Sequence, residues 1–201
     1  MIKVILFDCD GPLIKREKYF SQRLEEETGA KIDTKNESSF FKGEFLDCEV
    51  GKADLKEILP KWLPVWQWQK SVDELLKYWF EGERVVDPQM ADYIKYLREN
   101  GVKCYLSTNN EKYRTEYLAS VVGLKELLDG VFSSCYIGHM KPEVKFWEII
   151  FGQLKGVNKD EVLVLDDKML SIESARSFGF NAEHYESFEK TVQQFKKIYQ
   201  L

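Results

Sequence analysis

The chain has 201 residues, of which 44% are apolar and 31% charged; this is ordinary for a soluble globular protein and excludes a disordered chain. No apolar run approaches the roughly 20 residues of a membrane span, so we expect no membrane partner. The 29 basic and 34 acidic residues give a net charge of −5, which argues against nucleic acid as a partner. A small phosphorylated metabolite would need only a local site.

Cysteine usage indicates the compartment. The 4 cysteines form no CxxC pair and have no metal-type spacing. We therefore expect reduced thiols and a cytoplasmic location. The apolar start ends at Asp8, which makes it too short for a secretory signal. The oligomeric state is left open.

The first predicted element is a buried strand at residues 2–7. Residues 15–84 follow it without a convincing strand, and we expect a helical insert there. Two capping boxes, Thr34 with Glu37 and Ser71 with Glu74, predict helix starts within the insert. The charged runs 15–18 and 25–27 are expected to be solvated helix faces.

The insert is also rich in tryptophan. A small helical domain needs large side chains for a core of its own, and this is the favoured interpretation of these residues. The alternative is a platform on which a substrate ring stacks. The tryptophans concerned are Trp62, Trp66, Trp68 and Trp79.

Beyond the insert, helical and strand patterns alternate. Asp87 and Pro88 predict a helix start, and Gly101 predicts the end of that helix. Apolar runs at 102–107, 131–137 and 162–165 predict strands, while stripes at 147–154 and 188–199 predict helices. This order predicts an α/β fold, with a Rossmann-like three-layer parallel-sheet core of residues 1–14 and 85–201. Residues 15–84 would form a small all-helical cap domain.

Polar side chains follow each predicted strand, at the edge where open α/β sheets bind ligands. Like charges about 4 Å apart repel by several kcal/mol, so the four aspartates among them need a cation. Carboxylate oxygens suit Mg²⁺, and a lysine beside them makes a phosphate ligand tolerable. The strand-end residues are Asp8, Cys9, Asp10 and Gly11, then Thr108 and Asn109, then Lys141, and finally Asp166 and Asp167.

These four segments resemble the four motifs of the haloacid dehalogenase superfamily, in the same order and across essentially the whole chain. The segment from Asp8 to Gly11 is similar to the DxDG motif, and the insert follows it where that superfamily has a helical cap. The resemblance implies a Mg²⁺-dependent phosphatase. Its substrate would be a small phosphomonoester, such as a sugar phosphate, cleaved through an aspartyl-phosphate intermediate.

The resemblance also implies individual roles. Asp8 would be the nucleophile, and Asp10 the general acid and then the general base. Thr108 and Lys141 would hold phosphoryl oxygens. Substrate would further be bound by Cys9, Gly11 and Asn109. Mg²⁺ would be bound by Asp8, by the backbone carbonyl of Asp10, and by one or both of Asp166 and Asp167.

Some positions depart from the family pattern. Pro12 removes a backbone donor from the first motif, and Lys168 and Ser171 follow the paired acids where other residues are common. His139 is expected to be an exposed loop residue, because Asp10 already fills the role of base. A phosphomutase and a non-enzymatic phospholigand-binding protein stay open as alternatives. A dehalogenase is disfavoured, because that branch lacks an acid at the position of Asp10.

Overall fold

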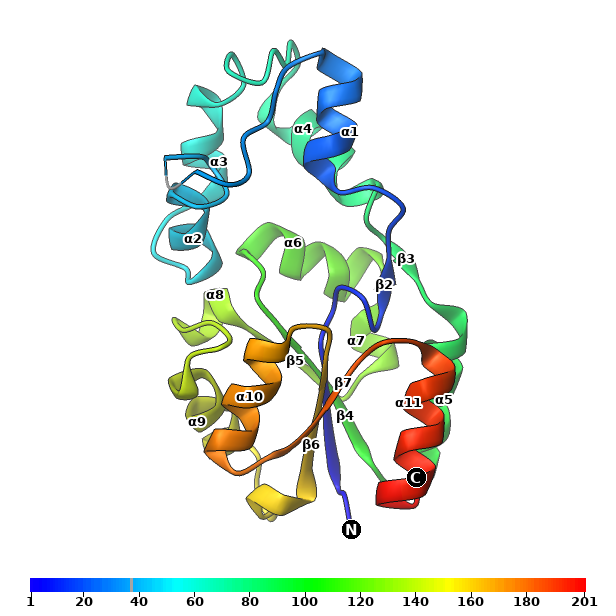
Figure 1. Ribbon diagram of the computed structural model, residues 1–201. Coiled ribbons are helices and arrows are strands. Elements are labelled where there is room, and N and C mark those ends of the chain that lie inside the picture. Colours follow the sequence, from blue (N-terminus) through cyan, green and yellow to red (C-terminus); the bar gives the residue numbers. More distant parts are fainter. Residues whose placement is uncertain (37) are drawn as a thin grey trace.

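The computed structural model describes residues 1–36 and 38–201. A five-stranded parallel sheet in the order β5-β4-β1-β6-β7 lies at its centre, with helices on both faces (Figure 1). The strands are β1 (Val4–Phe7), β4 (Lys103–Thr108), β5 (Gly130–Ser133), β6 (Val162–Asp166) and β7 (Asn181–His184). The expected Rossmann-like α/β core with a helical cap is confirmed. Among the described residues, no helix is long and apolar enough to cross a membrane.

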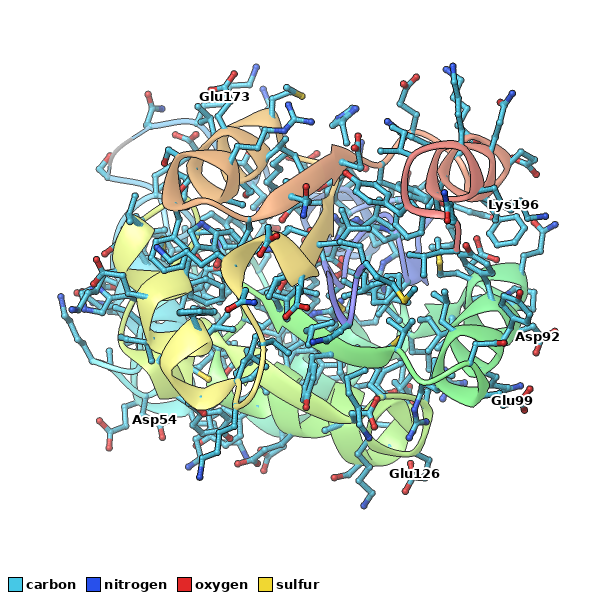
Figure 2. The ribbon with its side chains drawn as sticks, turned by 90° about the horizontal axis from the view of Figure 1, so that it is seen from below. Asp54, Asp92, Glu99, Glu126, Glu173 and Lys196 are labelled. Atoms are coloured by element: carbon cyan, nitrogen blue, oxygen red, sulfur yellow. The ribbon has the colours of Figure 1, made fainter. Side chains whose placement is uncertain are left out.

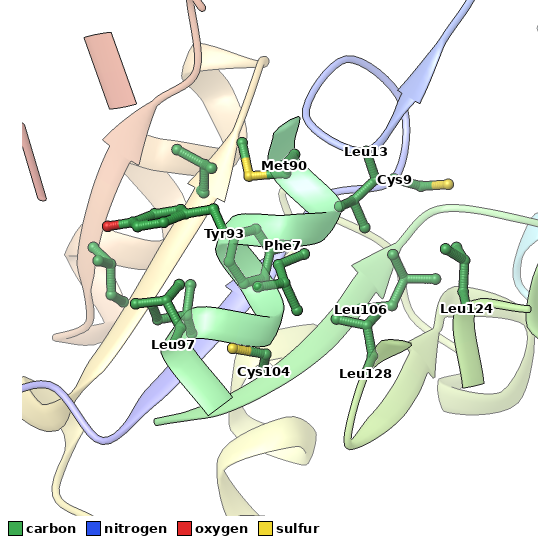
Figure 3. Packing of buried hydrophobic residues seen from close by; sticks show 14 of the residues in the cluster. Phe7, Cys9, Leu13, Met90, Tyr93, Leu97, Cys104, Leu106, Leu124 and Leu128 are labelled. Atoms are coloured by element: carbon green, nitrogen blue, oxygen red, sulfur yellow. The ribbon is translucent and has the colours of Figure 1, made fainter. Parts of the chain in front are cut away.

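Side chains alternate along the strands between two hydrophobic cores. Ile5 and Phe7 of β1 contribute to one core, which α5 (Pro88–Glu99) covers (Figure 3). Val4 and Leu6 contribute to the other, under α9 (Val144–Gln153) and α10 (Met169–Phe178). Because both faces are buried, the strand sequence is continuously apolar rather than alternating.

Shorter helices complete the core. They are α6 (Lys112–Glu116), α7 (Leu124–Leu127), α8 (Ser134–Ile137) and α11 (Phe188–Gln194), with the single turns η2 (Tyr117–Val121), η3 (Lys159–Glu161) and η4 (Phe195–Tyr199). Seen from below, charged side chains such as Asp92, Glu99 and Lys196 project outward from the periphery (Figure 2).

The predicted helix start at Asp87 is confirmed. Its carboxylate accepts hydrogen bonds from the backbone of Gln89 at 2.9 Å and of Met90 at 3.4 Å, and Pro88 opens α5. The helix ends at Glu99, and Gly101 follows with a φ of +85°.

The insert folds into a helical layer above the carboxyl ends of the strands (Figure 1). It contains α1 (Phe20–Thr28), α2 (Glu44–Glu49), α3 (Leu55–Ile58), η1 (Leu59–Lys61) and α4 (Val72–Glu81). Its aromatic core includes Phe20 stacked on Trp79, with ring centroids 4.2 Å apart. The tryptophans fill this core as predicted: three are buried, and Trp62 packs against them half-buried.

Two further features of the insert bear on the predictions. The capping box of Ser71 and Glu74 is confirmed at the start of α4. Glu37 of the other predicted box lies outside the described residues, but the helix start predicted at Thr34 was wrong, because the next helix after α1 is α2, which begins at Glu44. The chain passes between insert and core through a pair of antiparallel strands, β2 (Ile14–Lys15) and β3 (Val85–Val86). The sequence did not reveal them, because two residues each are too short for a pattern. We propose that the cap comprises residues 15–84, between these strands.

One predicted strand was wrong in part. The run 131–137 forms β5 only to Ser133, after which residues 134–137 form α8. The Oγ of Ser133 donates to the Asn110 carbonyl at 2.9 Å, and that of Ser134 accepts from the Asn110 amide at 3.1 Å. These hydroxyls anchor the chain to the loop after β4 where the strand stops. Strand β7 was missed because Asn181 and Glu183 break its apolar pattern.

Candidate active site

Adjacent strands bring the predicted carboxylates together. Phe7 of β1 pairs with Leu165 of β6, so Asp8 and Asp166 emerge side by side at the same edge of the sheet. With Asp167, each offers one ligand oxygen, and these atoms lie within 4.8 Å of one another. We call Asp8, Asp166 and Asp167 the carboxylate trio.

Lys141 lies inside this group of charges. Its Nζ is 2.8 Å from Asp8 Oδ1, 2.6 Å from Asp166 Oδ2, and donates to the Ser107 carbonyl at 2.9 Å. Burial opposes its charge, but the two carboxylates hold the pKa of Lys141 above its ordinary value. The lysine is therefore a fixed cation between two acids.

Asn109 positions the loop that carries Lys141. Its side-chain Nδ2 donates to the Lys141 carbonyl at 2.8 Å, and its Oδ1 accepts from the Lys141 amide at 2.9 Å. The side chain is thus engaged by protein backbone, although Asn109 also lines the cleft described below. Positioning of Lys141 is a role that the sequence did not suggest.

The trio carries excess negative charge. Burial raises the pKa of Asp8 to about 7, with Lys141 opposing the rise and Asp166 adding to it. Burial and the neighbouring Asp166 also raise the pKa of Asp167. Hard oxygen ligands with this unbalanced charge fit a divalent cation such as Mg²⁺.

The turn after Asp8 is tightly constrained. The Cys9 amide donates to Asp8 Oδ1 at 2.7 Å, and the Gly11 amide donates to the Ile14 carbonyl at 3.2 Å. Gly11 has a φ of +93°, and a Cβ there would lie 3.2 Å from Asp167 Oδ2. Both predicted substrate-binding amides are thus engaged within the turn, and glycine is needed for its close approach to the trio.

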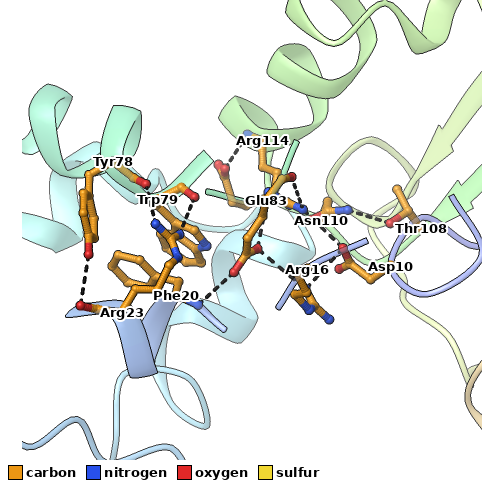
Figure 4. Close-up of polar contacts among 11 residues, drawn as sticks. Asp10, Arg16, Phe20, Arg23, Tyr78, Trp79, Glu83, Thr108, Asn110 and Arg114 are labelled. Carbon is orange, nitrogen blue, oxygen red and sulfur yellow. Dashed lines mark hydrogen bonds and ion pairs between the residues drawn. The ribbon is translucent and has the colours of Figure 1, made fainter. Parts of the chain in front are cut away.

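Asp10 lies apart from the trio, in a network of ion pairs (Figure 4). Its Oδ1 is 3.2 Å from Arg114 Nη2 and 3.2 Å from Arg16 Nη1. Glu83 Oε2 is 3.5 Å from Arg114 and 3.6 Å from Arg16, and its Oε1 accepts from the Phe20 amide at 2.8 Å. The network joins residues from both ends of the insert to the core.

These partners were missed by the sequence analysis. The run 15–18 was wrongly expected to be a solvated helix face, since Lys15 lies in β2 and Arg16 pairs with Asp10. Glu83 and Arg114 belong to no motif, so nothing in the sequence connects them with Asp10. The one available signal is that Arg16 and Glu83 lie at the two ends of the insert.

Thr108 ends β4 and is buried. Its Oγ1 accepts a hydrogen bond from Asn110 Nδ2 at 2.6 Å, a contact that the sequence analysis did not anticipate. Because Thr108 Oγ1 accepts this hydrogen bond, the hydroxyl proton of Thr108 points away from Asn110. His139 pairs with Glu143 at 2.7 Å and does not line the cleft, in agreement with its expected minor role.

A cleft of about 470 Å³ separates the insert from the strand ends. Its walls combine aromatic and charged side chains. From the core come Asp10, Asn109, Asn110, Arg114 and Lys168, and from the insert come Arg16, Phe20, Phe41, Phe45, Glu49, Trp79 and Glu83, with further polar residues at the rim. Lys168, one of the departures from the family pattern, thus lies at the site.

Comparisons with known proteins agree with this arrangement. A sesquiterpene phosphatase from Aspergillus oryzae is 25% identical over 112 residues, which are 56% of this chain and 57% of that relative. The chain therefore matches little more than half the length of this curated relative.

Solved structures share the fold over nearly the whole chain. A protein from Porphyromonas gingivalis described as a predicted HAD-like family hydrolase has a TM-score of 0.78 at 22% identity, covering 100% of this chain and 99% of that one. A family enzyme from Bacteroides thetaiotaomicron, solved with magnesium and inorganic phosphate, has a TM-score of 0.80 at 17% identity. The match covers 97% of this chain and 100% of that one. The L-2-haloacid dehalogenase of Xanthobacter autotrophicus has a TM-score of 0.61 at 19% identity, and the match covers 98% of this chain and 84% of that one. Phosphate-binding and dehalogenating proteins thus share this architecture.

The family model described as haloacid dehalogenase-like hydrolase matches residues 2–179, which include all four strand-end motifs. This protein belongs to the haloacid dehalogenase-like hydrolases.

Proposed function

We propose that the protein is a Mg²⁺-dependent phosphatase that hydrolyses a small phosphomonoester through an aspartyl-phosphate intermediate. The observation that carries the proposal is the carboxylate trio around Lys141, together with Asp10, which follows Asp8 in the same turn and lines the cleft. The phosphatase from Aspergillus and the magnesium–phosphate complex of the Bacteroides enzyme support it. Asp10 favours phosphoryl transfer over dehalogenation, because it supplies an acid for an oxygen leaving group.

The proposed reaction has two steps. An oxygen of Asp8 forms a bond to phosphorus while the ester oxygen leaves, taking a proton from Asp10. A water molecule then attacks the aspartyl-phosphate and gives its proton to Asp10, which releases inorganic phosphate and restores Asp8. The two arginines beside Asp10 fix its carboxyl group at the cleft between these steps.

The other residues stabilise charge and position groups. Lys141 orients Asp8 and offsets the negative charge of the phosphoryl group. Thr108 would donate its hydroxyl proton to a phosphoryl oxygen. Asp8, Asp166, Asp167 and the Asp10 carbonyl would hold Mg²⁺, which supplies further neutralisation of phosphoryl charge when bound.

The test is phosphate release from p-nitrophenyl phosphate, measured with Mg²⁺, with EDTA and in the Asp8→Asn variant. Release should require Mg²⁺ and fall to the background of a protein-free sample in Asp8→Asn, because the amide is no nucleophile. Asp92→Asn, the same chemical change on the exposed face of α5, should keep full activity.

Acid quenching during turnover should trap a phosphorylated wild-type protein and no phosphorylated Asp8→Asn protein. An active Asp8→Asn variant would disprove the mechanism. Sugar phosphates followed by ³¹P NMR should yield inorganic phosphate, whereas an isomeric sugar phosphate would indicate a phosphomutase.

A further inference from the structure

One charged side chain of the cleft has no part in the proposed mechanism. Glu49 is the last residue of α2 and lines the cleft from the insert, together with Asp10, Asn109 and Lys168 from the core. It belongs to none of the four motifs, and it shares the cleft with Asp10, the residue that the proposed mechanism places beside the leaving group.

The charges of the cleft fall into two groups. Arg16 and Arg114 are paired with Asp10 and Glu83, so these four are committed to one another. The side chains of Glu49 and Lys168, in contrast, make no ion pair or hydrogen bond with the residues that the structure describes. Apart from Asp10, which the proposed reaction uses, they are the charged groups of the cleft that remain available to a ligand.

The carboxyl of Glu49 is poorly solvated. Burial raises its pKa to about 7, with Lys168 opposing and Asp10 adding to the rise. Glu49 is half-buried, and a partly desolvated acceptor without a protein partner gains free energy from a ligand that donates hydrogen bonds to it. Two neighbouring hydroxyl groups can donate to the two oxygens of one carboxylate.

The insert also contributes aromatic rings to this cleft. Phe45 lies against Trp79 with ring centroids 5.5 Å apart, and Phe41 lies 5.8 Å from Phe45. These side chains line the same cleft. Aromatic faces combined with a hydrogen-bonding side chain suit a compact group that is apolar on its ring faces and polar at its edges.

We infer that Glu49 is a specificity-determining residue, which selects phosphomonoesters whose leaving group is uncharged and bears hydroxyl groups, that is, sugar and polyol phosphates. The inference rests on the proposed function. The Glu49 carboxylate repels a second phosphate on the leaving group, and the Lys168 ammonium in the same cleft opposes this repulsion. Since a phosphomutase passes through a bisphosphate, the same residue favours hydrolysis over isomerisation.

The test compares Glu49→Gln with Glu57→Gln, which makes the same change at an exposed position of α3. The substrates are a panel of hexose, pentose and glycerol phosphates, a hexose bisphosphate, and phenyl phosphate, which carries no hydroxyl group. In Glu49→Gln, the ratio of kcat/KM for the best panel member to that for phenyl phosphate should fall about tenfold or more. Relative turnover of the bisphosphate should rise, and Glu57→Gln should leave all ratios unchanged.

A binding measurement separates this inference from the proposed function. Calorimetry with Mg²⁺ would compare Asp8→Asn with the double variant Asp8→Asn/Glu49→Gln, and binding of the best panel member should weaken about tenfold in the latter. If wild-type protein hydrolyses neither phenyl phosphate nor any panel member, the proposed function fails while this binding comparison still reports on Glu49. The inference would be overturned if Glu49→Gln left the kcat/KM ratios and the binding affinities unchanged, or if it lowered kcat/KM equally for panel members and phenyl phosphate. It would also be overturned if no panel member bound to the Asp8→Asn protein.

Discussion

Burial makes the charged residues of the site depend on one another for charge compensation. Asp8, Asp166 and Lys141 are 5%, 0% and 5% exposed, so each depends on the others for charge compensation. Breaking such a buried pair leaves one charge unmatched in a poorly polarisable surrounding. The identities of these residues were predictable because motifs mark strand ends. Glu49, Glu83 and Arg114 were not, because their importance arises only from what lies beside them.

Glu111 offers a test of this burial effect outside the trio. It is 2% exposed and caps α6, accepting from the Tyr113 and Arg114 amides. Burial raises its pKa to about 7, above the ordinary value of 4.5 for a glutamate side chain. The folded state therefore holds this proton more tightly than the unfolded state, and the contribution of Glu111 to stability is lost as the pH rises through about 7.

We expect the free energy of unfolding of the wild type, relative to Glu111→Gln, to decrease between pH 5 and pH 8 by on the order of 2 kcal/mol. Urea denaturation at four pH values in this range would measure it. Glu99→Gln, at an exposed position on α5, should show a difference that does not change with pH. A pH-independent difference for Glu111→Gln would contradict the burial argument.

At the scale of elements, residues within one turn determined two helix starts, whereas contacts between distant residues determined where strand β5 ends. The N-cap at Asp87 and the capping box at Ser71 were recognisable because both depend on residues within one turn. The end of β5 was not, because hydroxyls of Ser133 and Ser134 bond to Asn110, which is more than 20 residues away.

Replacement of Asp87 by alanine should lower the free energy of unfolding by about 1 kcal/mol, because two backbone amides at the start of α5 lose their acceptor. Thermal and urea denaturation would measure the loss. Asp92→Ala on the exposed face of the same helix should change stability by less than about 0.5 kcal/mol. Equal effects of the two substitutions would show that the cap does not stabilise α5.

At the scale of the molecule, the described residues of the insert contact the core at several points, among them Phe80 beside Tyr117 with ring centroids 5.5 Å apart and two polar regions. One is the network of Asp10, Arg16, Glu83 and Arg114 near the connecting strands. The other is farther along the insert, where Tyr113 donates to Asp54 at 2.8 Å and Gly51 packs on the Cys135 carbonyl. Together these contacts hold the insert against the core.

Gly51→Ala should disturb the second contact. Gly51 has a φ of +71°, and an added Cβ would clash with the Cys135 carbonyl oxygen, so the insert must shift away from the core. We expect a loss of about 1–3 kcal/mol in unfolding free energy and a lower kcat/KM, since strained backbone and a clash combine. Gly152→Ala in α9, where a Cβ meets nothing within 4 Å, should be neutral or stabilising. Wild-type stability and kcat/KM in Gly51→Ala would refute this role.

The sequence by itself determined the fold class, the helical insert, and the residues at the strand ends, because apolar periodicity and short motifs are local properties of the chain. Only the tertiary structure decided that Lys141 lies between Asp8 and Asp166, that Arg16 and Arg114 hold Asp10, and that Glu49 faces the cleft. These contacts join residues far apart in the chain. They depend on the order of the strands and on how the insert packs over the sheet, and neither leaves a periodic or local trace in the sequence.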